Sequence, residues 1–377
     1  MKFIHISDLH IGKKLNEFSL AEDQRHILGE ILKIADTERP DCVFIAGDIY
    51  DKSMPSGEAV EMFDAFLYEL TLLNTNIFII SGNHDSPERI SFGARLMQNS
   101  RVFIAPVYDG TVYKHSLKDS FGLINIYLLP FVTPRQVRRF YDAETESYND
   151  AVKTAISEIP DDESERNVIL THQFVTGAVQ SDSEDISVGG TDNIDASLFD
   201  KFDYVALGHI HRPQSVLRDT VRYCGTPLKY SFSEASHQKS VTLGLMNEKG
   251  NIALSYIPLT PLHDMREIRG TYEEVTDKRN YGDLPTDDYI HITLTDEFDV
   301  PDALFKLRTI YPNLMKLDYD NKRTQSSGEL TLDDTVERRS PLQIFCDFYK
   351  QRMGNDMNDT QRNFCEKIMT EIWEDEK

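Results

Sequence analysis

Short, continuous apolar runs recur through the first two-thirds of the chain, and longer stretches with a helical repeat separate several of them. Five of these runs predict strands, over Phe3–Ile6, Val43–Ala46, Ile77–Ile80, Val168–Leu170 and Tyr204–Leu207. Continuous apolar runs of this length suit strands that are covered on both faces, as in layered α/β proteins. The pattern therefore predicts an α/β fold for residues 1–260.

Apolar residues three and four positions apart predict the intervening helices. The three clearest cover Ala21–Ala35, Pro55–Leu73 and Glu88–Met97. We expect their apolar faces to pack against the predicted sheet. The apolar stripe over Pro55–Leu73 is broad, so part of it could instead form a dimer interface, and the pattern alone leaves both alternatives open.

The character of the chain changes after residue 260. A strand over Tyr289–Leu294, a helix over Ala303–Ile310 and a strand over Leu314–Leu317 predict a small α/β accessory domain, which we place at residues 261–322. The polar residues 323–339 predict a linker. We thus expect a main domain over 1–260, the accessory domain, the linker and a C-terminal segment over 340–377.

Two amphipathic helices are predicted in the C-terminal segment. Ser340 is a suitable N-cap before Pro341, and Gly354 is a suitable end for the first helix. The second helix starts near Asp359. A two-helix hairpin cannot bury both apolar faces within itself, so it docks on the chain's own globular body or, as we favour, on a partner protein.

The composition fits a soluble protein of the cytoplasm. Four cysteines show no C-x-x-C spacing, no apolar stretch approaches the roughly 20 residues of a membrane span, and polar residues interrupt the N-terminal apolar run too early for a signal peptide. The net charge of −23 argues against a nucleic-acid partner, although metal ions can hold a phosphodiester in place of lysines. The acidic cluster of Asp182, Glu184 and Asp185 predicts a solvated loop.

Polar islands follow each of the five predicted strands. They are Asp8-x-His10, Gly47-Asp48-x-x-Asp51, Gly82-Asn83-His84-Asp85, His172 and Gly208-His209-x-His211. Carboxylate oxygens, imidazole nitrogens and one amide oxygen are suitable ligands for a pair of divalent cations. Loops that leave strand ends are where α/β sheets place their sites, so five such islands can converge on one point.

We predict a two-metal centre with seven ligands. One ion is expected to bind Asp8, His10 and His211. The other is expected to bind Asn83, His172 and His209. Asp48 lies between them, and Asp8 and His10 should project from one face of an extended strand exit. Two ions about 3.5–4 Å apart can clamp a phosphate and activate a water for in-line attack.

The remaining histidine of the islands, His84, is the candidate general acid that protonates the leaving oxygen, with Asp85 orienting its ring. Single Asp-x-His or His-x-His pairs occur by chance, but the five islands in this order do not. The chain has no G-x-S-x-G for a serine hydrolase, no Walker A motif and no pair of CxxC motifs.

The islands resemble those of the calcineurin-like metallophosphoesterase family, and longer segments resemble its SbcD branch of nuclease subunits for DNA double-strand-break repair. The closer resemblance lies in Gly47-Asp48-Ile49-Tyr50-Asp51, Tyr204-Val205-Ala206-Leu207-Gly208-His209-Ile210-His211-Arg212-Pro213-Gln214, Tyr223-Cys224-Gly225-Thr226-Pro227, Tyr230-Ser231-Phe232-Ser233-Glu234 and Pro261-Leu262-His263-Asp264-Met265-Arg266. It covers nearly the whole chain and is most specific up to residue 266.

This resemblance implies a two-sheet α/β sandwich flanked by helices, a small capping domain that helps to engage DNA, and a C-terminal helical hairpin. In the family the hairpin binds the coiled coil of an SMC-like ATPase, SbcC. The resemblance further implies a homodimer within a two-plus-two complex and manganese as the cofactor. It implies ATP-dependent double-strand exonuclease and single-strand or hairpin endonuclease activity in DNA repair, replication and recombination.

Carried over residue by residue, the resemblance assigns the seven ligands as above and matches His84 to the catalytic histidine. Asp51 stands where relatives often have histidine, which leaves its role open. Two alternatives remain. One is a small-molecule phosphodiesterase or phosphatase with the same core, although Lys52 and Asp85 stand where protein phosphatases usually have arginine and glutamate. The other is a non-catalytic scaffold.

Overall fold

A computed structural model describes the chain apart from residues 17, 142–144, 162–163, 185–192, 322–340 and 376–377. It divides into two compact units, Met1–Met265 and Arg266–Lys377. The division into four segments stays a prediction, and its linker lies outside the described residues. Among the residues that the structure describes, no helix has the length and apolar character that a membrane crossing requires.

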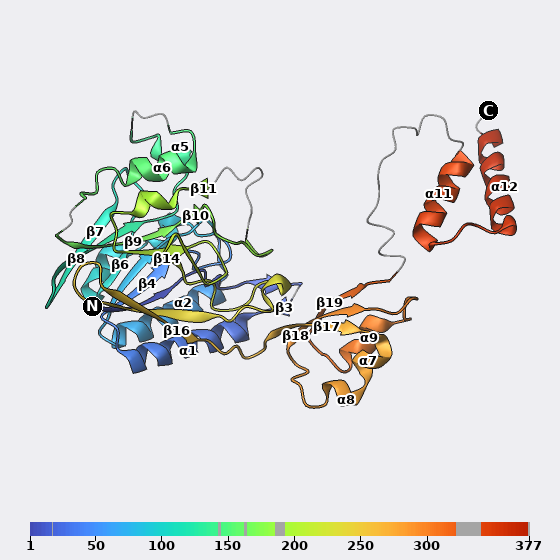
Figure 1. Cartoon of the computed structure of the whole chain (residues 1–377), viewed down its shortest axis with the longest axis horizontal. Helices are drawn as coiled ribbons and strands as arrows, with labels where there is room; N and C mark the ends of the chain where they lie inside the picture. The colour runs from blue at the N-terminus through green and yellow to red at the C-terminus, as the bar shows by residue number, and fades with distance from the viewer. Residues whose placement is uncertain (17, 142–144, 162–163, 185–192, 322–340, 376–377) are drawn as a thin grey trace. The chain divides into compact units, whose positions relative to one another are not determined.

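Two six-stranded sheets form the first unit (Figure 1). The first sheet has the order β16-β15-β1-β4-β5-β6. Its strands β1, β4, β5 and β6 run parallel, and β15 and β16 extend it in antiparallel fashion. The strands are β1 (Lys2–Ile6), β4 (Cys42–Ala46), β5 (Asn76–Ile80), β6 (Val102–Ile104), β15 (Ser240–Met246) and β16 (Ile252–Pro258).

The second sheet has the order β13-β14-β12-β9-β8-β7. Its strands β8, β9, β12 and β14 run parallel, with antiparallel strands at both edges. They are β7 (Tyr113–Asp119), β8 (Gly122–Leu129), β9 (Arg166–His172), β12 (Tyr204–Gly208), β13 (Gln214–Val216) and β14 (Arg218–Tyr223). All five predicted strands are present. The edge strands β7 and β16 were missed because half-buried and exposed residues alternate along them without a continuous buried apolar run.

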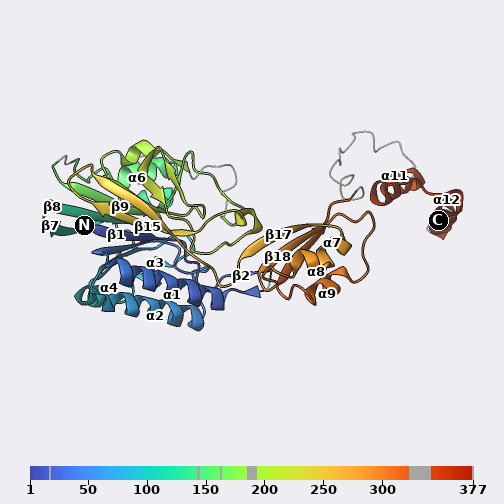
Figure 2. The ribbon, with the colours of Figure 1, turned by 60° about the horizontal axis from the view of Figure 1, so that its bottom comes forward.

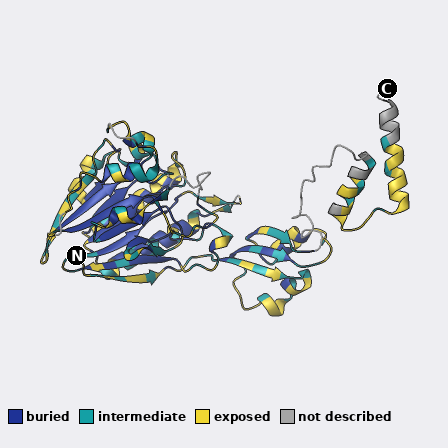
Figure 3. Cartoon of the chain, turned by 45° about the horizontal axis from the view of Figure 1, so that its top comes forward, coloured by how far each residue is buried: buried dark blue, intermediate teal, exposed yellow. Residues whose placement is uncertain are grey.

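Aromatic and aliphatic side chains fill the space between the two sheets. The strands of both sheets consist largely of buried residues, drawn in dark blue in Figure 3. Phe3, Phe44 and Phe78 from the first sheet meet Tyr204 and Ile126 from the second. Helices α1 (Ala21–Glu38) and α2 (Gly57–Leu72) cover the outer face of the first sheet (Figure 2). The predicted α/β sandwich flanked by helices is confirmed.

Short elements complete this unit. They are β2 (Lys14–Leu15), β3 (Phe18–Ser19), α5 (Pro134–Val137), α6 (Tyr148–Ala155), β10 (Phe174–Val175), β11 (Asn193–Ile194) and the 3-10 turns Gln98–Ser100, Ala196–Phe199 and Phe232–Glu234. Helix α6 packs Ala151, Val152 and Ala155 into the apolar cluster on the outer face of the second sheet.

The predicted helix over Glu88–Met97 is wrong as a single element. It consists of α3 (Pro87–Ile90) and α4 (Ala94–Met97), separated by a turn in which Gly93 has φ = +75°. Residues with positive φ cannot continue a right-handed helix. The break leaves Phe92 and Leu96 exposed instead of packed on the sheet.

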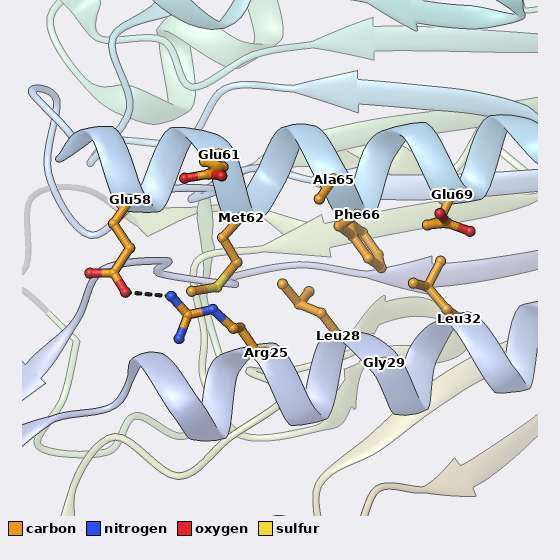
Figure 4. A pocket seen from close by; sticks show the side chains of 10 residues that line it. All are labelled: Arg25, Leu28, Gly29, Leu32, Glu58, Glu61, Met62, Ala65, Phe66 and Glu69. Carbon is orange, nitrogen blue, oxygen red and sulfur yellow. Dashed lines mark hydrogen bonds and ion pairs between the residues drawn. The ribbon is translucent and has the colours of Figure 1, made fainter.

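A groove of about 350 Å³ runs between α1 and α2 (Figure 4). Leu28 and Leu32 of α1 face Met62 and Phe66 of α2 across its floor. Arg25 pairs with Glu58 at one end, and the other charged residues of the wall are Glu61 and Glu69. This surface is acidic and apolar, so it lacks the positive charge that a nucleic-acid backbone requires.

The second unit contains a three-stranded sheet of order β17-β18-β19. Its elements are β17 (Met265–Gly270), α7 (Tyr272–Thr276), α8 (Lys278–Tyr281), β18 (Tyr289–Leu294), α9 (Ala303–Arg308) and β19 (Leu314–Tyr319). Strands β18 and β19 are parallel, and α9 buries Leu307 against Ile290 and Ile292. This is the small α/β domain that the sequence predicts.

The C-terminal helices are α11 (Pro341–Met353) and α12 (Asp359–Asp375). They form a hairpin in which the Gln361 amide donates a hydrogen bond to the Tyr349 hydroxyl at 3.0 Å. Phe348 and Phe364 are 52% and 65% exposed. The hairpin therefore presents apolar rings to its surroundings, as its sequence predicts.

Arg166, at the start of β9, joins strands of both sheets. Its guanidinium is 2% exposed, pairs with Asp119 at the end of β7, and donates to the carbonyl oxygens of Asn247 and Gly122 at 2.7 and 3.0 Å. We expect Arg166→Ala to lower the free energy of unfolding by about 3 kcal/mol, because two carbonyls lose their donor and Asp119 keeps only the N-terminal ammonium and the Phe121 amide as partners. Urea unfolding measures this.

The matched control is Arg95→Ala, on the exposed face of α4. It should change the free energy of unfolding by less than about 0.5 kcal/mol. Equal stability of the two variants would contradict a structural role for Arg166.

Candidate metal centre

The five islands leave parallel strands at corresponding ends of the two sheets. Asp8 and His10 follow β1, and Asp48 follows β4. The amides of Asp8 and His10 donate to the carbonyls of Gly47 and Asp48, both at 3.0 Å, so the two exits are tied together. Because the carboxyl ends of parallel strands share one edge, the loops that carry ligands meet there.

Several of the predicted ligands have a left-handed backbone. Asp8, His10, Asp48 and His209 have φ values of +53°, +43°, +48° and +99°. The expectation that Asp8 and His10 project from an extended strand is therefore wrong, because β1 ends at Ile6 and the chain coils tightly beyond it. Non-glycine residues with positive φ are uncommon and cluster at functional sites, where surrounding contacts hold them.

Glycines make room for these side chains. A Cβ on Gly82 would overlap the side chain and backbone of Asp48. A Cβ on Gly208 would overlap the carbonyl of Ala46 and come within 2.6 Å of the His172 ring. Both positions are occupied by glycine because the backbone passes directly against a predicted ligand.

The structure brings the first predicted ligand group together. Donor atoms of Asp8, His10 and His211 lie within 4.8 Å of one another. The Nε2 atoms of His10 and His211 are 3.2 Å apart. All three side chains are buried.

The second predicted group also converges. The amide oxygen of Asn83 is 3.0 Å from Nε2 of His172 and 2.9 Å from Nδ1 of His209. Nδ1 of His172 contacts the carbonyl of Ala46 at 2.8 Å. A carbonyl only accepts hydrogen bonds, so Nδ1 carries a proton and Nε2 is the ring atom that faces the site.

Asp48 lies between the two groups, as the sequence predicts. Its Oδ2 atom is 3.6 Å from Nε2 of His10 and 3.3 Å from Nε2 of His172. Its Oδ1 atom accepts a hydrogen bond from the amide of His84 at 2.9 Å. The carboxylate is thus fixed with one oxygen toward both histidines.

These residues fit a pair of divalent cations. The ring nitrogens that face the site, Nε2 of His10, Nε2 of His211 and Nδ1 of His209, are buried beside the carboxylate of Asp48 and the amide oxygen of Asn83. Buried polar atoms normally have partners, and a cation among these atoms would provide one for their lone pairs. Oxygen and nitrogen donors without thiolates suit manganese, iron or zinc.

The ionisation of the site reflects its burial. Burial raises the pKa of Asp8 to about 6, against the opposing effect of His172 and His211. Burial also acts on Asp48, but the neighbouring His172, His10 and His84 outweigh it and hold the pKa of Asp48 far below its usual range.

Among the histidines, burial lowers the pKa of His209 to about 3 and that of His10 well below its usual value. For His172, burial is outweighed by the carboxylates of Asp48 and Asp8, which raise its pKa to about 9. Two buried carboxylates thus attract positive charge, which His172 supplies as a proton and a metal ion would supply in its place.

His84 lies beside the two groups and is more accessible than the buried ligands, with a side chain that is 21% exposed. Its Nδ1 atom donates to the carbonyl of Asp51 at 3.1 Å, and its Nε2 atom is 3.9 Å from Asp48. Asp85, which the sequence assigned to orienting this ring, instead accepts hydrogen bonds from the amides of Ile49, Tyr50 and Gly82.

The structure shows the contacts of Asp51, whose role the sequence leaves open. Its carboxylate accepts a hydrogen bond from Lys13 at 2.8 Å and lies 3.8 Å from Nδ1 of His10. Its carbonyl, not its side chain, orients His84.

Sequence reasoning also missed residues around His211. Glu184, expected in a solvated acidic loop, is buried and accepts a hydrogen bond from the amide of His211 at 2.7 Å. Ser183 contacts the ring of the same histidine. Neither residue follows a strand or glycine, so no local signal marked them.

The sequence profile of calcineurin-like phosphoesterases matches residues 1–213, more than half of the chain. The chain belongs to the calcineurin-like phosphoesterase family. A second profile, the type 5 capsule protein repressor C-terminal domain, matches residues 261–353. The resemblance to the SbcD branch is confirmed by the SbcD subunit of the SbcCD nuclease from Staphylococcus epidermidis, which is 30% identical over 99% of both chains.

Solved structures share only limited similarity with the whole chain. A dimetal phosphatase from Danio rerio is 11% identical, with a TM-score of 0.42, covering 70% of this chain and 98% of its own. GAP50, described as the anchor in the inner membrane complex of Plasmodium, is 12% identical with the same TM-score, covering 85% of this chain and 98% of its own.

We expect Gly208→Ala to lose metal binding, because its methyl group would push the Ala46 carbonyl and the His172 ring apart. Elemental analysis after loading with Mn²⁺ should show at least one ion fewer per chain, and thermal unfolding should show a less stable protein. Gly29→Ala is the matched control. Its methyl group meets no atom within 4 Å in α1 and should leave the metal content unchanged.

We also expect the affinity for Mn²⁺ to rise with pH. His172 binds a cation only without its Nε2 proton, and Asp8 only when ionised, so binding releases protons from groups with pKa values of about 9 and about 6. Calorimetry at pH 6, 7.5 and 9 should show affinity increasing across the series, with proton release detected in buffers of different ionisation enthalpy. A flat profile would contradict these protonation states.

Proposed function

We propose that the chain is a two-metal phosphodiesterase that cleaves DNA, the nuclease subunit of an SbcCD-type complex. The observation that carries this proposal is the convergence of seven oxygen and nitrogen donors into two groups, with Asp48 between them and the accessible His84 beside them. The name of the full-length relative, a nuclease subunit, supports DNA as the substrate.

In this proposal the ligands are Asp8, His10, Asp48, Asn83, His172, His209 and His211. When bound, two divalent cations, of which we propose Mn²⁺, would neutralise a phosphate and lower the pKa of a water molecule. The chain's own residues supply the rest. Buried rings on both sheets exclude bulk water, and the carbonyl of Ala46 fixes the direction of the His172 ring.

His84 is the proposed general acid. Because Nδ1 donates to the Asp51 carbonyl, Nε2 is the atom left to hold a proton toward the leaving oxygen. The ring is accessible enough for a substrate to reach, whereas six of the seven proposed ligands, all except Asn83, are buried. Its backbone amide is bonded to Asp48, which keeps the proton donor next to the metal groups.

We further propose that the chain acts with an SMC-like ATPase partner, SbcC, which the C-terminal hairpin binds. The exposed apolar side chains Phe348, Met353, Phe364 and Ile368 of α11 and α12 support a protein partner. The complex would act as an ATP-dependent double-strand exonuclease and a single-strand or hairpin endonuclease in DNA repair, replication and recombination, in the cytoplasm.

A homodimer is also part of the proposal. Tyr68 of α2, Phe92 in the turn between α3 and α4, and Leu96 of α4 are 61%, 82% and 78% exposed. Large exposed apolar side chains favour association. The accessory domain would help to engage DNA. The groove between α1 and α2 is acidic and does not suit the negatively charged DNA backbone.

We expect His84→Ala to lower Mn²⁺-dependent cleavage of a labelled DNA duplex by about 10²- to 10⁴-fold, the contribution of a general acid. Its content of two Mn²⁺ ions and its binding to the ATPase should persist. His26→Ala is the control, since His26 lies on α1 and contacts the carbonyl of Thr260.

The assay is run with and without the ATPase, beside a small phosphodiester. Turnover of the small diester with DNA untouched in both conditions would assign the chain to small-molecule phosphodiesterases. Equal loss of metal and activity in His84→Ala would contradict the proton-donor role. Absence of any Mn²⁺-dependent hydrolysis would leave the non-catalytic scaffold as the remaining alternative.

A further inference from the structure

His211 is held at every polar atom except one. Its amide donates to Glu184 at 2.7 Å, and its carbonyl accepts from Lys239 at 2.8 Å and from the amide of Thr226 at 3.1 Å. Its ring atom Nδ1 is 2.5 Å from the hydroxyl of Ser183. Only Nε2 remains, and it points toward Nε2 of His10.

The contacts of Ser183 determine which ring nitrogen of His211 carries the proton. The Ser183 hydroxyl also contacts Oε1 of Glu234, and a carboxylate can only accept. The single hydroxyl proton therefore goes to Glu234, so the hydroxyl oxygen accepts from Nδ1–H of His211. Nε2 of His211 is consequently a lone pair directed into the metal centre.

A buried ion pair anchors this chain of hydrogen bonds. Glu234 and Lys239 have side chains that are 0% and 4% exposed, and Oε2 of Glu234 lies 2.5 Å from Nζ of Lys239. Lys239 also donates to the hydroxyl of Thr226 at 2.7 Å and to the carbonyl of His211. One ion pair therefore restrains both the ring and the backbone of the same histidine.

A buried pair of charges is weak evidence of a stabilising role, because its desolvation costs about as much as its attraction returns. This pair contacts the backbone carbonyl of His211 directly and the ring of His211 through Ser183, which indicates that it orients a predicted metal ligand. Outer hydrogen-bond partners of a metal-binding histidine fix its tautomer and its orientation, and their loss commonly weakens metal binding.

We propose that Ser183, Glu234 and Lys239 form a relay that positions His211 for one of the two metal ions. This inference rests on the proposed role of His211 as a ligand. Ser183 is a positioning residue, acting through His211 and touching neither substrate nor metal. Because Ser183 comes from the loop that follows β10, this loop contributes to one ion's affinity although it carries no ligand of its own.

The test is calorimetric titration of the full-length metal-free protein with Mn²⁺. Ser183→Ala removes the hydroxyl and leaves the Glu234–Lys239 pair intact. We expect one of the two sites to weaken by about 10- to 100-fold and the other to keep its affinity. Ser183→Thr restores a hydroxyl and should restore the affinity, and the melting temperature of the metal-free protein should be the same in both variants.

Ser231→Ala is the matched control, since the Ser231 hydroxyl also contacts Glu234, at 3.2 Å, but not His211. It should bind both ions normally. Unchanged affinities in Ser183→Ala, or equal weakening in Ser231→Ala, would overturn the relay.

His211→Ala separates this outcome from failure of the metal site. If His211→Ala loses one ion while Ser183→Ala binds both normally, the ligand assignment stands and the relay fails. If His211→Ala still binds both ions with full affinity, His211 is not a ligand, and the relay fails with that assignment.

Discussion

The close approach of the two sheets at their carboxyl edges is the constraint on which the rest of the site depends. The ring of His172, from the second sheet, donates to the carbonyl of Ala46 at the end of β4 in the first. The amide of His209 donates to the carboxylate of Asp8 in the opposite direction. Gly208 permits this approach, since a side chain there would occupy the space of the Ala46 carbonyl.

This proximity concentrates charge in a place that water does not reach. Asp8 and Asp48 are buried with four histidines around them, and the two carboxylates respond differently, one with a raised pKa and the other with a lowered one. Such an arrangement is unfavourable for an apolar interior and favourable for cations. Four of the predicted ligands also have a left-handed backbone, a conformation that residues other than glycine rarely adopt.

The sequence predicts the elements of the fold that have a local signal. Continuous apolar runs located five central strands, and the polar islands behind them contain every member of the candidate metal-binding groups among the described residues. The roles of the neighbours were not predictable in this way. Asp85 and Asp51 belong to the same motifs, yet the backbone carbonyl of Asp51 orients His84 while Asp85 binds amides, a distinction that depends on turn geometry.

Other errors have equally physical causes. Gly93 divides the helix predicted over Glu88–Met97 because its positive φ ends the helical turn, and no spacing of apolar residues reports that. Glu184 looked like one member of a solvated acidic cluster, but the fold carries it inside to the amide of His211. Long-range pairings of this kind join residues that the sequence separates, so only the folded chain shows them.

The predicted ligands are divided between the sheets, with Asp8, His10, Asp48 and Asn83 from the first and His172, His209 and His211 from the second. Cations held by both sets would act as crosslinks between two halves of one domain. A metal ion that binds only the folded state raises the population of that state by mass action. The supply of free metal in a cell would therefore influence how much of this protein survives proteolysis. Abundance and activity would then respond together to metal starvation.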